Sequence, residues 1–132
     1  MTPSLPGITL TPLAAAVPAW RATVDAAAWR AGCEAASSAG GRLAALWASD
    51  DRDRTGGFTV RALLVTFEGL VCLELTVPDA QASYPDLSDV FPCASRMQRA
   101  AFDLLGVSPA GASRDGRGWL RHGAWRADAH PL

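Results

Sequence analysis

The chain has 132 residues, which suits one domain with a buried core. Its 12 basic and 13 acidic residues leave a formal net charge of −1. This balance excludes the strongly basic surface that binding to nucleic acid or to anionic lipid requires.

Cys33, Cys72 and Cys93 are widely spaced and form no C-x-x-C pair. We therefore expect neither a disulfide framework nor a zinc or iron–sulfur site. No apolar run approaches the roughly 20 residues that span a bilayer, and the N-terminus lacks the basic start and apolar stretch of a signal peptide. These features predict a soluble chain in a reducing cytoplasm, with no cofactor of its own.

The first segment, residues 1–18, is rich in proline, and we predict an N-terminal arm in which residues 8–11 could form a brief edge strand. Residues 19–39 lack proline and repeat apolar side chains at helical spacing, which predicts a helix that ends at a Gly-Gly pair. The repeating residues are Trp20, Val24, Ala27 and Ala31. Residues 42–49 alternate in the manner of a strand.

Residues 50–57 read as a charged turn without an apolar anchor. Residues 58–67 and 70–77 predict a hairpin closed by a Glu-Gly pair. The second strand alternates an apolar side with a polar one, so one face should be buried and the other wet or covered by a partner. The polar side carries Cys72, Glu74 and Thr76.

Residues 84–106, which we call the signature segment, combine a stiff loop with a helix. Two prolines each fix their own φ and hold the preceding residue extended; they are Pro85 and Pro92. From Ala94 the apolar spacing becomes helical, and Gly106 supplies the C-terminal stop. Two charged residues of this helix stand four positions apart and can pair. They are Arg99 and Asp103.

Residues 107–132 are dominated by turn-forming residues, which predicts an irregular tail anchored by aromatic side chains such as Trp119 and Trp125. A helix, a strand meander and a second helix together indicate one α+β domain over residues 1–132. Its expected architecture is two layers, a mostly antiparallel sheet with helices packed on it.

The signature segment resembles the 30 kDa subunit family of proton-pumping NADH-quinone oxidoreductase, respiratory complex I. It is equally similar to the matching N-terminal domain of formate-hydrogenlyase-type hydrogenase large subunits. The resemblance rests on Tyr84, Pro85, Leu87, Phe91, Pro92, Ala94, Arg99, Asp103 and Gly106. The chain departs from the family pattern where Arg96 replaces a tryptophan and where Gln98 and Ala100 replace two glutamates.

The resemblance implies a non-catalytic docking domain that braces a hydrogenase-like large subunit, beside the small iron–sulfur subunit. The whole complex would lie at the inner face of the cell membrane. The expected docking residues are Tyr84, Pro85, Phe91, Pro92, Arg99, Asp103, Gly106, Trp119, Trp125 and His130. We expect substitution of Arg99 and Asp103 by alanine to weaken partner binding far more than it lowers the melting temperature.

The sequence is also consistent with other classes of function. The domain could be a stand-alone scaffold or assembly factor, or a small enzyme with Cys93 as nucleophile and His122 as its base. His122 and His130 do not make a zinc site, since such a site needs about three protein ligands. Arg99 and Asp103 could simply be an exposed surface pair. The tryptophans of the tail could pack on their own domain.

Overall fold

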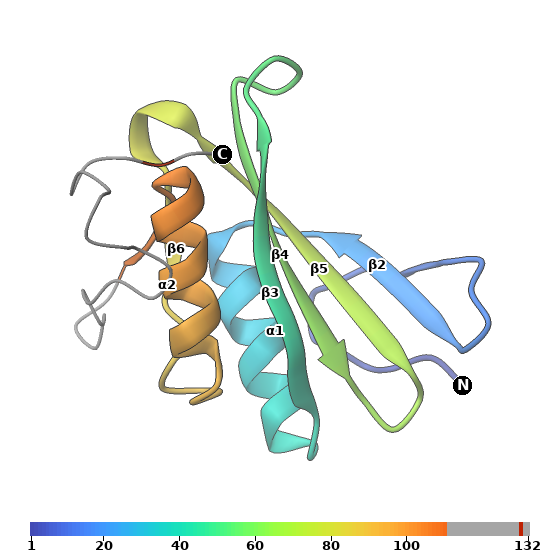
Figure 1. The fold of residues 1–132 in the computed structure, drawn as a ribbon. Helices are drawn as coiled ribbons and strands as arrows, with labels where there is room; N and C mark the ends of the chain where they lie inside the picture. The colour runs from blue at the N-terminus through green and yellow to red at the C-terminus, as the bar shows by residue number, and fades with distance from the viewer. Residues whose placement is uncertain (111–129, 131–132) are drawn as a thin grey trace.

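The computed structural model describes residues 1–110 and residue 130 (Figure 1). The main sheet has five strands in the order β1-β2-β5-β4-β3. These are β1 (Thr11–Pro12), β2 (Ala19–Thr23), β3 (Arg42–Asp51), β4 (Gly57–Val65) and β5 (Leu70–Pro78). β2 runs parallel to β5, and every other neighbouring pair is antiparallel.

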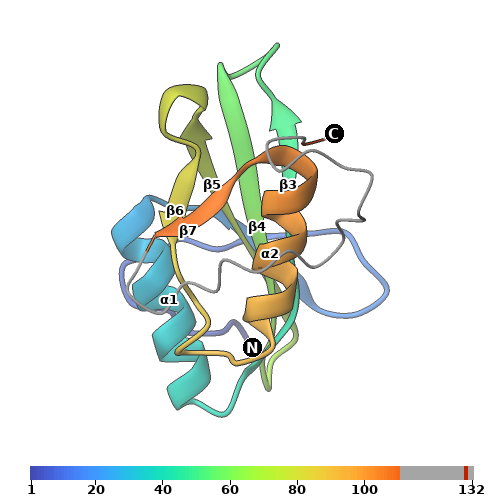
Figure 2. The same cartoon turned by 60° about the vertical axis from the view of Figure 1, so that its left-hand side comes forward.

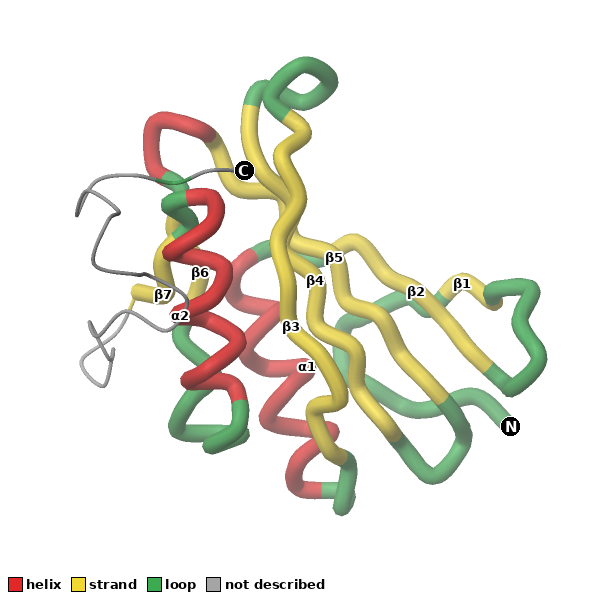
Figure 3. The backbone as a smooth tube through the Cα atoms, in the orientation of Figure 1, coloured by secondary structure: helices red, strands yellow, loops and turns green. Residues whose placement is uncertain are grey.

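Two helices, α1 (Ala26–Ser38) and α2 (Ala94–Leu105), lie on the same face of the main sheet (Figure 3). Turning the molecule brings both helices in front of the strands (Figure 2). A 3-10 turn η1 (Asp79–Gln81) leads from β5 to β6 (Ser83–Pro85), which pairs in parallel with β7 (Ser108–Ala110). The expected two-layer α+β fold with a mostly antiparallel sheet is confirmed.

The core lies between the helices and the inner face of the sheet. Alternation along β4 and β5 sends every second side chain inward, where burial of apolar area supplies the main driving force for folding. The inward residues of these two strands are Phe58, Val60, Ala62, Leu64, Val71, Leu73, Leu75 and Val77. α1 adds Trp29 and Cys33 from above, and both are fully buried.

The predicted helix over residues 19–39 is wrong in its first third. Residues Ala19–Thr23 form strand β2, in which Trp20 and Ala22 are buried while the residue between them is exposed. Alanine fits either periodicity, so the helical repeat drawn through Trp20 carries little information. The helix begins only after Asp25, whose carboxylate accepts a hydrogen bond from the Ala28 amide at 2.8 Å as an N-cap.

The proline-rich arm and the turn between β3 and β4 are also more ordered than the sequence suggests. Leu5 of the arm is buried in the core. In the turn between β3 and β4, the Arg52 guanidinium lies 5.1 Å from the centre of the Phe58 ring, so the expectation of a turn without an apolar anchor is wrong. β4 stops at Val65, which leaves Phe67 in the next turn with its side chain 93% exposed.

The tail does not become irregular directly at residue 107, and the expected boundary is wrong by a few residues. Val107 is fully buried, and β7 follows it. The strand forms because β6 offers an edge: the Ser108 amide donates to the Ala82 carbonyl at 2.9 Å, and the Asp86 amide donates to the Ala110 carbonyl at 3.0 Å. These bonds bring the two ends of the signature segment together.

Candidate docking site

The signature segment and the strand that follows it fold as one closed unit, which consists of β6, a loop over residues 86–93, α2 and β7. α2 ends at Gly106, which adopts the left-handed conformation with φ of 77° and donates its amide to the Phe102 carbonyl. A side chain at this position would be strained by its φ, and its Cβ would crowd the His130 ring at 3.2 Å. Gly106 is therefore confirmed as the helix stop.

A buried carboxylate and a buried amide organise the loop from within. Asp86 and Gln98 are 4% and 3% exposed. The Gln98 Nε2 group donates to the Asp86 carboxylate at 2.7 Å, and Gln98 Oε1 accepts from the Leu87 amide at 2.9 Å. The same carboxylate accepts from the backbone amide and the hydroxyl of Ser88 at 3.0 and 2.8 Å. The side-chain amide of Gln98 thus provides a hydrogen-bond donor for the buried carboxylate and an acceptor for a backbone amide of the loop.

Arg30 of α1 clamps the same loop from outside. Its Nη1 group donates to the Asp86 carbonyl at 2.9 Å, and its two terminal nitrogens donate to the Asp89 carboxylate at 2.9 and 2.6 Å. Its Nε lies 3.2 Å from Glu34, one turn further along α1. This fork-to-carboxylate geometry fixes the direction of the loop relative to α1.

Trp29 holds the start of the signature segment. Its indole Nε1 donates to the Pro85 carbonyl at 3.3 Å, and its ring meets the Tyr84 ring edge to face with the centroids 6.1 Å apart. The Tyr84 side chain is 2% exposed, and burial raises the pKa of its hydroxyl. This hydroxyl has no hydrogen-bond partner within the described part of the chain.

The structure corrects the expectation that Tyr84 and Phe91 serve as aromatic anchors for a partner. Both side chains belong to the core, and Phe91 is only 6% exposed. They therefore support the loop from below. The exposed positions of the loop and of the first turn of α2 are Asp89, Pro92, Cys93 and Arg96.

The carboxylate near the end of α2 is buried as well. Asp103 is 1% exposed, so the alternative of an exposed surface pair with Arg99 is wrong for this carboxylate. The predicted pairing of Arg99 with Asp103 stays a prediction. His130 packs on the end of α2, where its ring meets the Phe102 ring edge to face at 5.0 Å and its Nδ1 lies 3.2 Å from the Asp103 carbonyl oxygen. His130 therefore contacts its own domain.

Trp119, Trp125 and His122 lie outside the described residues, so their predicted roles stay predictions. Cys93 is exposed, and its Sγ lies 3.7 Å from the Leu43 carbonyl oxygen. Among the residues that the structure describes, no three His, Cys, Asp or Glu side chains are grouped to hold a metal ion. No helix of the described part is long and apolar enough to cross a membrane.

Sequence reasoning missed three residues that position the loop: Arg30, Asp86 and Gln98. Gln98 stands out in the sequence only as a departure from the family pattern. Asp86 follows a Tyr-Pro pair, and aspartates in turns often accept a hydrogen bond from the backbone two residues further on. This local pattern indicates a structural role for Asp86. Arg30 carries no signal, because its partners Asp86 and Asp89 are 56 and 59 positions away in the chain.

The Arg30 clamp makes a testable prediction about pH. Hydrogen bonds from Arg30 hold the pKa of Asp89 below its ordinary value. A lowered folded pKa gives stability that is present above the unfolded value of about 3.9 and is lost as the pH falls through the folded pKa. Arg30→Gln should therefore lower the melting temperature near neutral pH and make little difference at about pH 2. Equal losses at both pH values would contradict a stabilising ion pair between Arg30 and Asp89.

Two solved structures have the same fold as this chain. One match is titled "Nqo5 of the trypsin-resistant fragment (1-134)", with a TM-score of 0.69 and 16% identity over 80% of this chain and 87% of that chain. Another is a chain of the membrane-bound sulfane sulfur reductase MBS, an archaeal respiratory membrane complex, with a TM-score of 0.71 and 16% identity over 90% and 71%. Both likenesses show the α+β fold.

The sequence itself then identifies the family. Residues 22–132 match the family described as the 30 Kd subunit of respiratory-chain NADH dehydrogenase. The chain belongs to this family, which confirms the resemblance seen in the signature segment. No curated protein sequence matches the chain.

Proposed function

We propose that the protein is a non-catalytic docking subunit or domain of a respiratory complex of the NADH-quinone oxidoreductase or membrane-bound hydrogenase type. Its partners would be a hydrogenase-like large subunit and the neighbouring small iron–sulfur subunit. The electron-transfer chemistry and its cofactors would belong to these partners. The domain would sit at the cytoplasmic face of the membrane and meet the bilayer only through the complex.

The observation that carries this proposal is the fixed conformation of the loop. The Asp86–Gln98 pair holds it from inside and Arg30 holds it from outside, at distances of 2.6 to 2.9 Å. A loop that is already ordered loses little conformational entropy when it binds, which favours association. These contacts leave Pro92 and Arg96 on the surface as exposed groups. Arginine is enriched in the residues that dominate binding energy.

The surface that we assign to the large subunit therefore consists of Asp89, Pro92, Cys93 and Arg96, which we call the docking surface. Four other residues support this surface without belonging to it, because they shape the loop or end the helix: Tyr84, Pro85, Phe91 and Gly106. Arg99→Ala and Asp103→Ala do not separate binding from stability, because the Asp103 side chain is buried. An exposed residue gives the sharper test.

Arg96→Asp is expected to reduce co-purification of the tagged chain with the large subunit by about tenfold or more, as loss of an arginine hot spot does. Its melting temperature should stay close to that of the unchanged chain, because surface substitutions usually alter stability by less than about 0.5 kcal/mol.

The matched control is Asp53→Arg, an equal charge reversal in the exposed turn between β3 and β4. It should leave co-purification unchanged. Retention of the large subunit by Arg96→Asp, or its loss with Asp53→Arg, would reject the assignment. If the unchanged chain binds no large subunit at all, the stand-alone scaffold is the better account.

A further inference from the structure

The face of the main sheet opposite the helices is covered by no other element of the described chain (Figures 1 and 3). Strand registers place Trp47, Arg61 and Glu74 side by side across β3, β4 and β5, and Arg21 of β2 lies beside Cys72 of β5. We call this surface the outer sheet face. An antiparallel sheet commonly packs one face on the core and leaves the other to solvent or to a partner.

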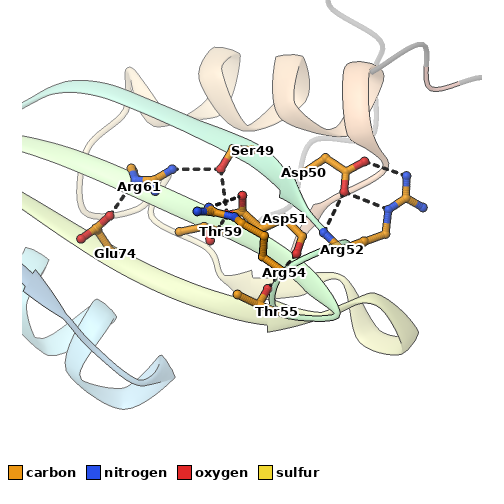
Figure 4. Close-up of polar contacts among 9 residues, drawn as sticks. All are labelled: Ser49, Asp50, Asp51, Arg52, Arg54, Thr55, Thr59, Arg61 and Glu74. Atoms are coloured by element: carbon orange, nitrogen blue, oxygen red, sulfur yellow. Dashed lines mark hydrogen bonds and ion pairs between the residues drawn. The ribbon is translucent and has the colours of Figure 1, made fainter.

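At the centre of the outer sheet face, side chains of neighbouring strands form a network of hydrogen bonds and ion pairs, which we call the ladder (Figure 4). Arg61 donates from Nε to the Glu74 carboxylate at 2.8 Å and from Nη1 to the Ser49 hydroxyl at 2.9 Å. Arg21 lies 3.4 Å from the other oxygen of Glu74. The side chains of Arg61 and Glu74 are only 25% and 16% exposed, so strand neighbours hold them in place before any partner arrives.

The ladder continues toward the turn between β3 and β4. The Ser49 hydroxyl donates to the Asp51 carboxylate at 3.3 Å, and the Thr59 hydroxyl and Arg54 donate to the same carboxylate at 2.5 and 2.8 Å. Asp51 is thereby matched by Arg54. Glu74 is shared by two guanidinium groups, which leaves one positive charge of the ladder without a carboxylate of its own.

Arg42 adds to this positive excess. It pairs with Val65 across β3 and β4, and Val65 follows the inward-facing Leu64, so alternation puts both on the outer face. The face therefore carries an excess of positive charge in a chain whose net charge is −1. Trp47, 40% exposed, supplies an apolar contact of the type that anchors interfaces.

We propose that the outer sheet face is a second docking surface, which receives an acidic surface of another protein subunit. Carboxylates of the partner would meet Arg21 and Arg42 beside a contact with Trp47. A second copy of this chain fits less well, because the same excess of arginine would face itself. The domain would then stand between two partners, with the docking surface on one side and the outer sheet face on the other. This inference rests on the proposed function in one respect, because its test uses the assembly with the large subunit.

The three cysteines provide a built-in test, since each reports a different part of the molecule. Cys72 lies on the outer sheet face, half-buried, and Cys93 lies on the docking surface, exposed. Cys33 is buried, and burial raises the pKa of its thiol to about 12, so it serves as the unreactive reference. Burial and then Glu74 also raise the pKa of Cys72, so all rates must be compared at one pH.

The experiment measures alkylation of each cysteine by a small maleimide, in the isolated chain and in the assembly purified through the large subunit. We expect Cys72 to react at least about tenfold more slowly in the assembly, because thiol reactivity follows access. Arg42→Glu should remove the slowing at Cys72 and leave the slowing at Cys93 as it is in the unchanged assembly.

Several results would overturn the inference. An equal rate at Cys72 in both samples, with Cys93 slowed, would reject the second surface and leave the proposed function intact. If Cys72 is alkylated slowly in the isolated chain and faster once that chain is diluted, the outer sheet face is covered by a second copy. If the alkylation of Cys72 stays slow on dilution, the chain covers this face itself.

Discussion

Gln98→Glu is expected to lower the free energy of unfolding by about 3 to 5 kcal/mol near neutral pH, the usual cost of an uncompensated buried charge. The substitution replaces an amide donor with a second carboxylate 2.7 Å from Asp86, and both groups are almost fully buried. This would remove a large part of the roughly 5 to 15 kcal/mol that stabilises a typical domain. Chemical denaturation of the variant and the unchanged chain measures the loss.

The loss should depend on pH with a definite sign. Two adjacent carboxylates raise the folded pKa of one of them above the unfolded value of about 4.3, because a shared proton relieves their repulsion. A raised folded pKa means that the deficit is small below the unfolded value and grows as the pH rises through the folded pKa. The melting temperatures of the two proteins should therefore diverge as the pH rises from about 4 to 8.

The matched control exchanges the two groups. Asp86→Asn combined with Gln98→Glu keeps one carboxylate and one amide at the same contact, so the double variant should recover most of the stability. A single variant as stable as the unchanged chain near neutral pH would contradict the role given to Gln98. So would a double variant no better than the single one.

Trp29→Ala is expected to cost about 3 to 5 kcal/mol, because it empties the largest fully buried site in the described core. It also removes the donor to the Pro85 carbonyl and the ring against Tyr84. Trp29→Phe keeps most of the volume and should cost less, about 1 to 3 kcal/mol for the unsatisfied carbonyl and the smaller ring.

The two tryptophan variants also separate packing from loop position. Amide hydrogen exchange across residues 84–93 should accelerate in both variants, and further in Trp29→Ala than in Trp29→Phe. Unchanged exchange in this range, with the expected loss of global stability, would show that Trp29 serves the core alone and does not position the signature segment.

Much of the fold follows from patterns that only one structure satisfies. The alternation in β4 and β5 required strands with one buried face, and Gly106 could end α2 because only glycine enters its conformation without strain. β2 could not be found in the same way. Its five residues are too few for a clear alternation, and alanine allowed a helix to be drawn through them.

The position of the candidate site was predictable and its internal contacts were not. Prolines, spacing and the family resemblance located the signature segment in the sequence. The exposure of its side chains depends on what packs beneath them, and Tyr84 and Phe91 became core residues because α1 and the main sheet meet there. Contacts such as Arg30 with Asp89 join distant parts of the chain and leave no local pattern.

The most direct test of the docking role is a site-specific crosslink made in the cell. A benzophenone amino acid in place of Arg96 lies on the exposed side of α2, and light would join it to whatever contacts that side. We predict a covalent adduct with the hydrogenase-like large subunit, and none with that subunit when the same group replaces Asp53. An adduct from position 53 but not from position 96 would contradict the account.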